Sequence, residues 1–159
     1  MKYEIERKFL IKNELWRNES AESVLYRQGY LSNVKQRTVR IRTAGSRGYI
    51  TIKGTGPGIK RTEFEYEIPR NDADELLDNV CEKPLIEKTR HKIQIENHIW
   101  EIDEFHGENS GLIIAEIELE NENETFQKPS WIGEEVSHDI RYFNSNLYKN
   151  PYKNWKINR

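Results

Sequence analysis

The fold is decided by one stretch near the start of the sequence, Glu4-Ile5-Glu6-Arg7-Lys8-Phe9-Leu10-Ile11. Side chains of a β-strand alternate between two faces, so Glu4, Glu6 and Lys8 share one face. The other face is apolar except for Arg7. Two carboxylates two positions apart on one strand face lie only about 7 Å apart. They repel each other unless a cation lies between them, and a hard divalent cation takes such oxygens as ligands.

The same alternation recurs along the chain and predicts a mainly β protein. Seven further segments show the period of two, at residues 24–31, 38–43, 49–54, 61–69, 85–96, 99–105 and 112–120. Helical spacing is found at 71–81, and shorter helical pieces are predicted at 13–18, within 123–131 and near residue 147. About eight strands with few helices are typical of an antiparallel meander or a closed barrel.

The polar faces of these strands carry charges in pairs two positions apart. The acidic pairs are Glu4 and Glu6, Glu63 and Glu65, Glu101 and Asp103, and Glu116 and Glu118. The basic pairs are Arg40 and Arg42, and Lys88 and Arg90, supported by Lys8, Lys53 and Arg61. On most alternating strands such a face is solvated, so the plainer interpretation is a barrel with its charges outside.

Segregation of the charges by strand favours the opposite arrangement, with the charged faces inside. Sheets stabilised by cross-strand ion pairs mix the two signs, whereas here whole strands are acidic and others are basic. Neighbouring carboxylates cost stability unless a charged ligand completes the site. A divalent cation suits the acids and an oligoanion suits the bases, so a metal ion with a phosphate chain would satisfy both. The apolar faces would then lie outside, covered by the helices and the aromatic tail.

Composition limits the classes of protein that are compatible with this sequence. The chain has 159 residues, which predicts a single domain over residues 1–159. Its net charge of −2 gives no general attraction to nucleic acid or to an anionic membrane. A single cysteine, Cys81, fits a reducing compartment. No signal peptide and no membrane-spanning apolar run is recognisable, so we expect a cytoplasmic protein.

The opening strand resembles the Glu-x-Glu-x-Lys signature of the CYTH superfamily, the triphosphate tunnel metalloenzymes. Later blocks match in order: Arg40-x-Arg42, Lys53, Arg61-x-Glu63-x-Glu65, Lys88-x-Arg90, Glu101-x-Asp103 and Glu116-x-Glu118. The stretch from Gly133 to Asn144 is similar to the bacterial branch. The resemblance covers almost the whole chain. It implies an eight-stranded antiparallel β-barrel that forms a tunnel, binds a triphosphate and uses Mg²⁺ or Mn²⁺, as in the small bacterial inorganic triphosphatases.

The resemblance also implies roles for individual residues in a metal-dependent hydrolysis of a phosphoanhydride. The residues expected to bind the phosphate chain are Lys8, Arg40, Arg42, Lys53, Arg61 and Arg90. Those expected to hold the metal are Glu4, Glu6, Glu65, Glu101, Asp103, Glu116 and Glu118. Lys88 or Glu63 is expected near the attacking water, and the sequence does not choose between them. Tyr30 is expected either to tune the substrate at the tunnel mouth or simply to close the barrel.

Several rival functions stay open at the level of sequence. The same fold is compatible with thiamine triphosphatase, nucleoside triphosphatase and adenylate cyclase activity, although no base-binding or thiazole-binding motif is recognisable. A non-catalytic polyphosphate-binding module is a second class, but it would need the bases without four carboxylate pairs. A plain interaction barrel with its charges outside is a third. The expected partner is therefore a triphosphate such as tripolyphosphate, ATP or thiamine triphosphate, and a homodimer is compatible with the sequence.

Overall fold

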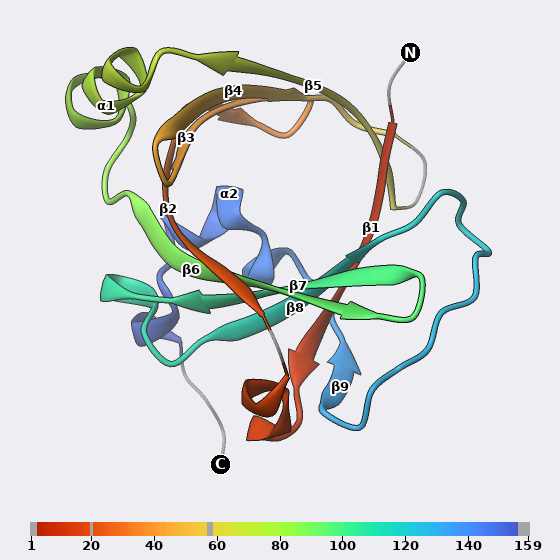
Figure 1. Ribbon diagram of the computed structural model, residues 1–159. Coiled ribbons are helices and arrows are strands. Elements are labelled where there is room, and N and C mark those ends of the chain that lie inside the picture. Colours follow the sequence, from red (N-terminus) through yellow and green to blue (C-terminus); the bar gives the residue numbers. More distant parts are fainter. Residues whose placement is uncertain (1–2, 20, 57–58, 156–159) are drawn as a thin grey trace.

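A closed antiparallel barrel of eight strands organises the molecule, as the sequence predicts (Figure 1). The computed structural model describes residues 3–19, 21–56 and 59–155. Its strands are β1 (Tyr3–Ile11), β2 (Glu22–Val34), β3 (Arg37–Ala44), β4 (Arg47–Lys53), β5 (Lys60–Ile68), β6 (Ile86–Ile95), β7 (His98–Phe105), β8 (Ile113–Glu118) and β9 (Ile132–Glu135). They follow the order β5-β4-β3-β2-β6-β7-β8-β1, and the pairing of β5 with β1 closes the ring. Strand β9 pairs with β1 outside the ring.

Helical segments are few and short. They are α1 (Arg70–Asn79), α2 (Asn144–Leu147) and the 3₁₀ turns η1 (Glu14–Asn18), η2 (Gly107–Asn109), η3 (Ile140–Tyr142) and η4 (Tyr152–Asn154). The helices predicted at 71–81 and at 13–18 are confirmed, and the Asn13 side chain accepts a hydrogen bond from the N–H of Leu15 as an N-cap. The helix predicted within 123–131 is wrong, because that segment forms turns and irregular chain. No helix of the described residues is both long and apolar enough to cross a bilayer.

The main hydrophobic core lies outside the barrel wall. Ile5 and Phe9 of β1 pack with Trp100 of β7, and the rings of Phe9 and Trp100 meet edge to face with centroids 5.6 Å apart. Trp16 of η1 and Trp131 before β9 cover this cluster from the outside. The odd-numbered residues of the opening strand therefore face outward, as the alternation predicts.

A second outer cluster attaches α1 to the opposite side of the barrel. Ala73 and Leu77 of α1 are fully buried against Ile41 of β3. The helix approaches the sheet closely at Gly48 of β4, where an added Cβ would lie only 2.6 Å from the Cβ of Ala73. A glycine is needed at this position because any side chain would force the helix off the sheet.

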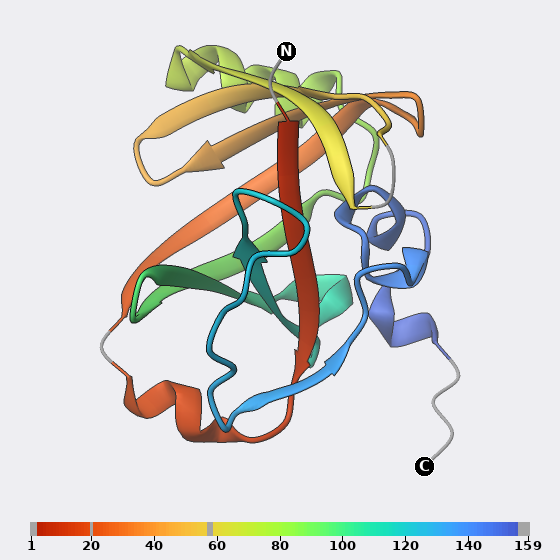
Figure 2. The same cartoon turned by 90° about the vertical axis from the view of Figure 1, so that its right-hand side faces the viewer.

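The C-terminal segment closes one end of the barrel instead of covering its outer wall. Figures 1 and 2 together place α2 at this end, within the outline of the ring of strands. Leu147 and Tyr148 pack there against Tyr30 of β2 and Phe105 of β7. The expectation that the aromatic tail covers the outer face was therefore wrong. The inward-facing end residues of several strands are apolar, so the tail buries its own apolar groups against them.

The contact between β1 and β9 gives a prediction about acid stability. The Arg7 guanidinium donates two hydrogen bonds to Glu135, at 2.8 and 2.6 Å, and holds the pKa of that carboxyl down to about 2. We expect Glu135→Gln to lower the free energy of unfolding at pH 7 by roughly 0.5–1 kcal/mol, since solvent screens this partly exposed pair. A depressed pKa stabilises the fold above the unfolded value near 4.5, and this stabilisation is lost as the pH falls towards 2.

Urea unfolding of both proteins at pH 7 and at pH 3 would measure this effect. The stability gap between them should shrink at the lower pH. Glu134→Gln is a matched control because it removes the same charge from an exposed neighbour with no ion pair among the described residues. A gap that stays constant with pH would show that the Arg7–Glu135 pair does not stabilise the fold electrostatically.

Candidate functional site

The barrel interior is polar, and the charged faces of the strands point into it. Lys8, Lys88, Arg90, Asp103 and Glu116 are all less than 9% exposed although their side chains are ionisable. Their neighbours in sequence face the outer clusters, as for Phe9 and Ile102. The prediction that the charges lie inside is thus confirmed for these residues, and the barrel with its charges outside is excluded.

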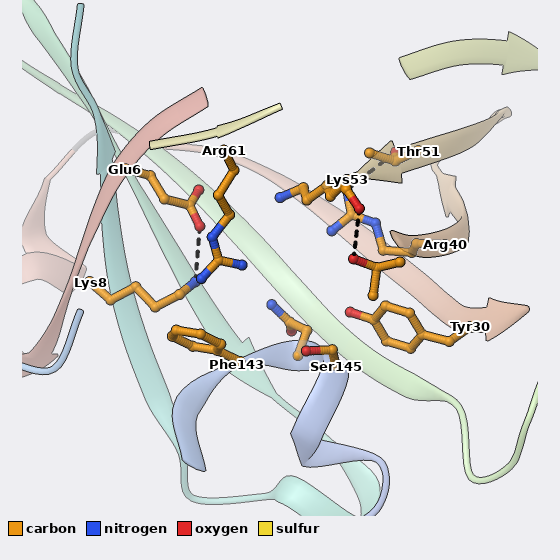
Figure 3. A pocket seen from close by; sticks show the side chains of 11 residues that line it. Glu6, Lys8, Tyr30, Arg40, Thr51, Lys53, Arg61, Phe143 and Ser145 are labelled. Carbon is orange, nitrogen blue, oxygen red and sulfur yellow. Dashed lines mark hydrogen bonds and ion pairs between the residues drawn. The ribbon is translucent and has the colours of Figure 1, made fainter. Parts of the chain in front are cut away.

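A cavity inside the barrel brings together residues from β1 to β5 and from the C-terminal segment (Figure 3). Glu6, Lys8 and Arg61 lie on one side in this view, and Arg40, Lys53 and Tyr30 lie on the other. The complete lining is Glu6, Lys8, Tyr30, Thr38, Arg40, Thr51, Lys53, Arg61, Phe143, Asn144 and Ser145. A wider space of about 610 Å³ adjoins it, sharing Arg61 and Phe143 and reaching Lys35 and Lys149 at the surface.

The six cations predicted to bind phosphate fall into two groups. Lys8, Arg40, Lys53 and Arg61 line the cavity. Arg42 and Arg90 do not line it, but their guanidinium carbons lie 4.8 and 5.0 Å from the centre of the same ring, that of Tyr26. Arg42 has a lowered pKa because it is buried and because Arg40 and Arg90 are close by. Four of the six cations therefore line the cavity, and the other two meet at the Tyr26 ring, which is not part of the lining.

Cross-strand ion pairs link the cations to the acids, which the sequence argument did not expect. The Nζ of Lys8 lies 2.7 Å from Glu116 and 3.2 Å from Glu6. Burial alone would lower the pKa of Lys8, but these two carboxylates raise it above its usual value. The Nζ of Lys53 lies 3.0 Å from Glu4 and 3.4 Å from Glu63. Opposite charges therefore meet across strands, and in Glu6 and Lys8 they also meet within β1.

The acid Glu65 of β5 lies between the two arginines of β3. Its carboxylate is 3.3 Å from Arg42 and 3.8 Å from Arg40, and it accepts a 2.7 Å hydrogen bond from the Thr51 hydroxyl. Burial opposes ionisation, but Arg42 and Thr51 together lower the pKa of Glu65. This carboxylate therefore orients both arginines across the β3–β4–β5 wall.

Lys88 and Arg90 share one buried carboxylate on the opposite wall. The Nζ of Lys88 is 2.7 Å from Asp103, and Arg90 donates two hydrogen bonds of 2.7 and 2.8 Å to the same group. Lys88 is 1% exposed. The pKa of Lys88 is lowered to about 8, because burial and the nearby Arg90 lower it by more than Asp103 and Glu116 raise it. The Lys88 amine can therefore lose its proton near neutral pH, which fits a group that handles protons.

Carboxylates also face one another across strands, as the sequence predicts. Glu6 of β1 lies opposite Glu118 of β8, and Glu101 of β7 lies opposite Glu116. Burial raises the pKa of Glu118, and the charges of Glu4 and Glu6 raise it further. Glu118 has no ion pair among the described residues. A bound cation would relieve this repulsion.

The donor chemistry at these acids fits a hard divalent cation, because all the groups offer carboxylate oxygens. In the described part of the chain, no three acidic, histidine or cysteine side chains are close enough to hold a metal ion as they stand. Most of the predicted metal ligands are paired with lysine or arginine instead. The predicted ligands are therefore brought to one interior, but not into one coordination shell.

Tyr30 takes part in closing the barrel, one of the two roles that the sequence left open. It lines the cavity, and at 5% exposure it also belongs to the cluster that closes the barrel. Its ring stacks on Tyr148 with centroids 5.4 Å apart, and its carbonyl accepts a hydrogen bond from the N–H of Glu82. Tyr148 donates its hydroxyl to the Glu82 carboxylate. Tyr30 is therefore a buried residue that Tyr148 and Glu82 hold in place.

Sequence reasoning missed several residues of the cavity. Thr51 shares the inward face with Lys53, so the period of two on β4 was the signal that could have identified it. Phe143, Asn144 and Ser145 come from a tail without periodicity, and no sequence pattern indicates that they enter the barrel.

Comparison with known proteins identifies relatives over almost the full chain. Residues 2–150 match the family model of the CYTH domain. An inorganic triphosphatase of Acetivibrio thermocellus is 56% identical over 153 residues, which cover 96% of this chain and 97% of the relative. An inorganic triphosphatase of Nitrosomonas europaea is 35% identical over 91% of this chain and 95% of its own length.

A solved structure extends the likeness to the fold. The crystal structure of the inorganic triphosphatase NE1496 matches with a TM-score of 0.66 and 32% identity. The match covers 91% of this chain and 96% of that chain.

Proposed function

The chain belongs to the CYTH domain family, and from this premise we propose that it hydrolyses inorganic tripolyphosphate inside the barrel with Mg²⁺ or Mn²⁺. The observation that carries the proposal is the cavity lined by Lys8, Arg40, Lys53 and Arg61, with carboxylates on the adjoining strands. A linear phosphate chain is the anion that can contact several such cations at once. The inorganic triphosphatases named above support this choice of substrate.

The cavity favours a phosphate chain without an organic group. Its two aromatic rings are already engaged, because Tyr30 stacks on Tyr148 and Phe143 packs beside Arg61, 4.6 Å from its guanidinium carbon. A nucleobase or a thiazolium ring would need an unoccupied aromatic face or an apolar pocket. In the described lining the remaining side chains are charged, hydroxyl-bearing or, in Asn144, an amide, and such groups suit a phosphate chain.

Cations and acids have separate tasks in the proposed reaction. Arginine forks bind phosphate oxygens in bidentate fashion, a task that suits Arg40 and Arg61 in the cavity and Arg42 and Arg90 beside it. Glu4, Glu6 and Glu118, with Glu101 and Glu116 beside them, are the carboxylates that would hold the metal. When bound, the metal supplies charge neutralisation on the phosphate chain and acidifies water. Lys88 would accept the proton of the attacking water, because its pKa is lowered to about 8 and its Nζ lies 3.3 Å from Asn144 of the cavity wall.

Release of phosphate from a panel of substrates tests the proposed function. The panel is tripolyphosphate, ATP, thiamine triphosphate and pyrophosphate, each with Mg²⁺, with Mn²⁺ and with EDTA, and ATP is also checked for cyclic AMP. Cleavage of tripolyphosphate that requires metal is the expected result. Preferred turnover of an organic triphosphate would overturn the choice of substrate, and tight binding without any turnover would identify a polyphosphate-binding module.

Glu118→Gln gives a prediction about the metal requirement. The change removes one carboxylate charge opposite Glu6 while it keeps the shape of the side chain. We expect the metal concentration for half-maximal activity to rise by about tenfold or more, because a neutral amide is a weaker ligand than a carboxylate. Titration of activity with Mn²⁺ and with Mg²⁺ would measure this.

The exposed Glu87 lies on the outer face of β6, so Glu87→Gln serves as the charge-matched control. If neither Glu118→Gln nor Glu6→Gln changed the metal concentration for half-maximal activity, this pair of acids would not belong to the metal site.

A further inference from the structure

The C-terminal segment contributes a neutral amide to the wall of a highly charged cavity. Asn144, the first residue of α2, lines the cavity beside Phe143 and Ser145. Its Oδ1 accepts a hydrogen bond of 3.3 Å from the Nζ of Lys88. No strand of the barrel provides this group, because Asn144 belongs to the C-terminal segment and not to one of the alternating charged strands.

We propose that Asn144 binds the substrate directly, by donating a hydrogen bond from its Nδ2 to a phosphate oxygen while its Oδ1 orients Lys88. The proposal rests on the proposed function, because the anion concerned is the tripolyphosphate in this same cavity. It assigns a binding role to a residue of the tail, which lies outside the charged strands.

The orientation of the Asn144 amide follows from the chemistry of its partner. A lysine ammonium has three donors and no acceptor, so the amide oxygen must face Lys88. The NH₂ group at the other end of the planar amide then points away from that lysine. Among the described residues it has no hydrogen-bond partner. An amide with an unused donor at a cavity wall is suited to an anionic oxygen.

Local hydrogen bonds and packing fix the backbone turn that carries this amide. The N–H groups of Asn146 and Leu147 donate to the carbonyl of Phe143 at 2.9 and 3.0 Å, which closes the turn around Asn144. Leu147 is fully buried in the cluster that closes the barrel. A preorganised donor loses little conformational entropy when the ligand binds.

Charge explains why an amide suits this position better than another cation. The ring of Phe143 already packs beside two cations, with its centroid 4.6 Å from the guanidinium carbon of Arg61 and 5.9 Å from the Nζ of Lys8. A further ammonium next to Lys88 would repel it, whereas the amide oxygen attracts it. Asn144 thus adds a donor for phosphate without adding positive charge.

Two substitutions at this position separate substrate binding from a structural role. Asn144→Asp keeps the size and the oxygen that faces Lys88, but it replaces the NH₂ donor by a negative oxygen. Asn144→Ala removes both ends of the amide. Asn150→Asp introduces the same charge on the exposed part of the same segment and serves as the control.

Equilibrium binding is the decisive measurement, since it does not depend on turnover. Titration calorimetry of wild-type protein and variants with tripolyphosphate in EDTA gives Kd, and steady-state hydrolysis with metal gives KM and kcat. We expect Asn144→Asp to raise both Kd and KM by about tenfold or more, because a hydrogen bond to a charged group is replaced by repulsion. Its thermal unfolding midpoint should match that of Asn150→Asp.

The outcomes are distinguishable from each other and from failure of the proposed function. Wild-type Kd and KM in Asn144→Asp would overturn the proposal, because a purely structural amide is satisfied by this variant. If binding is weaker in Asn144→Ala but not in Asn144→Asp, the proposal is also overturned, because the contact with Lys88 would then be the only role of Asn144. If the wild-type protein binds tripolyphosphate without hydrolysing it, the proposed function fails, but the binding series still decides the role of Asn144.

Discussion

Replacement of Arg40 by alanine is expected to lower kcat/KM for tripolyphosphate by about a hundredfold or more. Arg40 lines the cavity from β3, and its side chain is only 13% exposed. Removal of a preorganised donor to a group that gains charge in the transition state costs about that much in rate. The fold should survive, since the outer clusters that hold β3 do not include this side chain. Steady-state kinetics and thermal unfolding of the same preparation would test both statements.

Two further variants make the Arg40 result interpretable. Arg40→Lys keeps the charge but loses the planar fork, so it should recover only part of the lost activity. Arg47→Ala, at a side chain that is 66% exposed on the neighbouring strand β4, is the control for removal of an arginine from this hairpin. If Arg40→Ala proved as active as Arg47→Ala, the cavity would not be the phosphate site.

Lys88→Met is the second large effect that we expect. Methionine has a similar length but cannot carry a proton, and loss of a group that accepts the proton of water costs about 10²–10⁴ in rate. Asp103 keeps its two hydrogen bonds from Arg90, at 2.7 and 2.8 Å, so the variant should not leave a buried charge without a partner. Single-turnover hydrolysis of tripolyphosphate at saturating metal would measure the change in the chemical step.

The pH dependence shows which protonation state of Lys88 is active. A base works as the neutral amine, and that form becomes populated as the pH rises through the pKa of about 8. We therefore expect the wild-type rate to rise with pH near 8 and Lys88→Met to lose this rise. A rate that falls over the same interval would show that the ammonium is the active form. Retention of the rise in Lys88→Met but not in Glu63→Gln would transfer the role of base to Glu63.

Alternation of residue type predicted most of the barrel. An alternating strand has one buried and one polar side whatever its partners are, so β1, β3 and β6 could be recognised from their own residues. The residues that face inward, among them Lys8 and Arg42, followed from the same parity. The placement of the charged faces inside the barrel, and of the apolar faces outside it, was inferred from the segregation of acids and bases by strand.

Partners across strands could not be predicted in this way. The pairing of Glu4 with Lys53, which are 49 residues apart in the sequence, depends on ring closure between β1 and β5. The alternation of residue types within one strand does not indicate which residues of a distant strand lie opposite it, so the cross-strand ion pairs were missed. The tail was missed for another reason: Phe143 and Asn144 lie in short turns, where packing against the barrel end, and not periodicity, decides their position.

The placement of the apolar clusters outside the ring has a consequence for how this protein can change over evolutionary time. Phe9, Trp100 and Leu77 hold the strands together from the outer side, whereas the groups proposed to meet substrate project from the opposite side of the same strands. Adjacent positions in the sequence thus meet separate physical demands. Substitutions inside can alter ligand preference while the scaffold tolerates them, and substitutions outside can adapt the protein to heat without touching its chemistry.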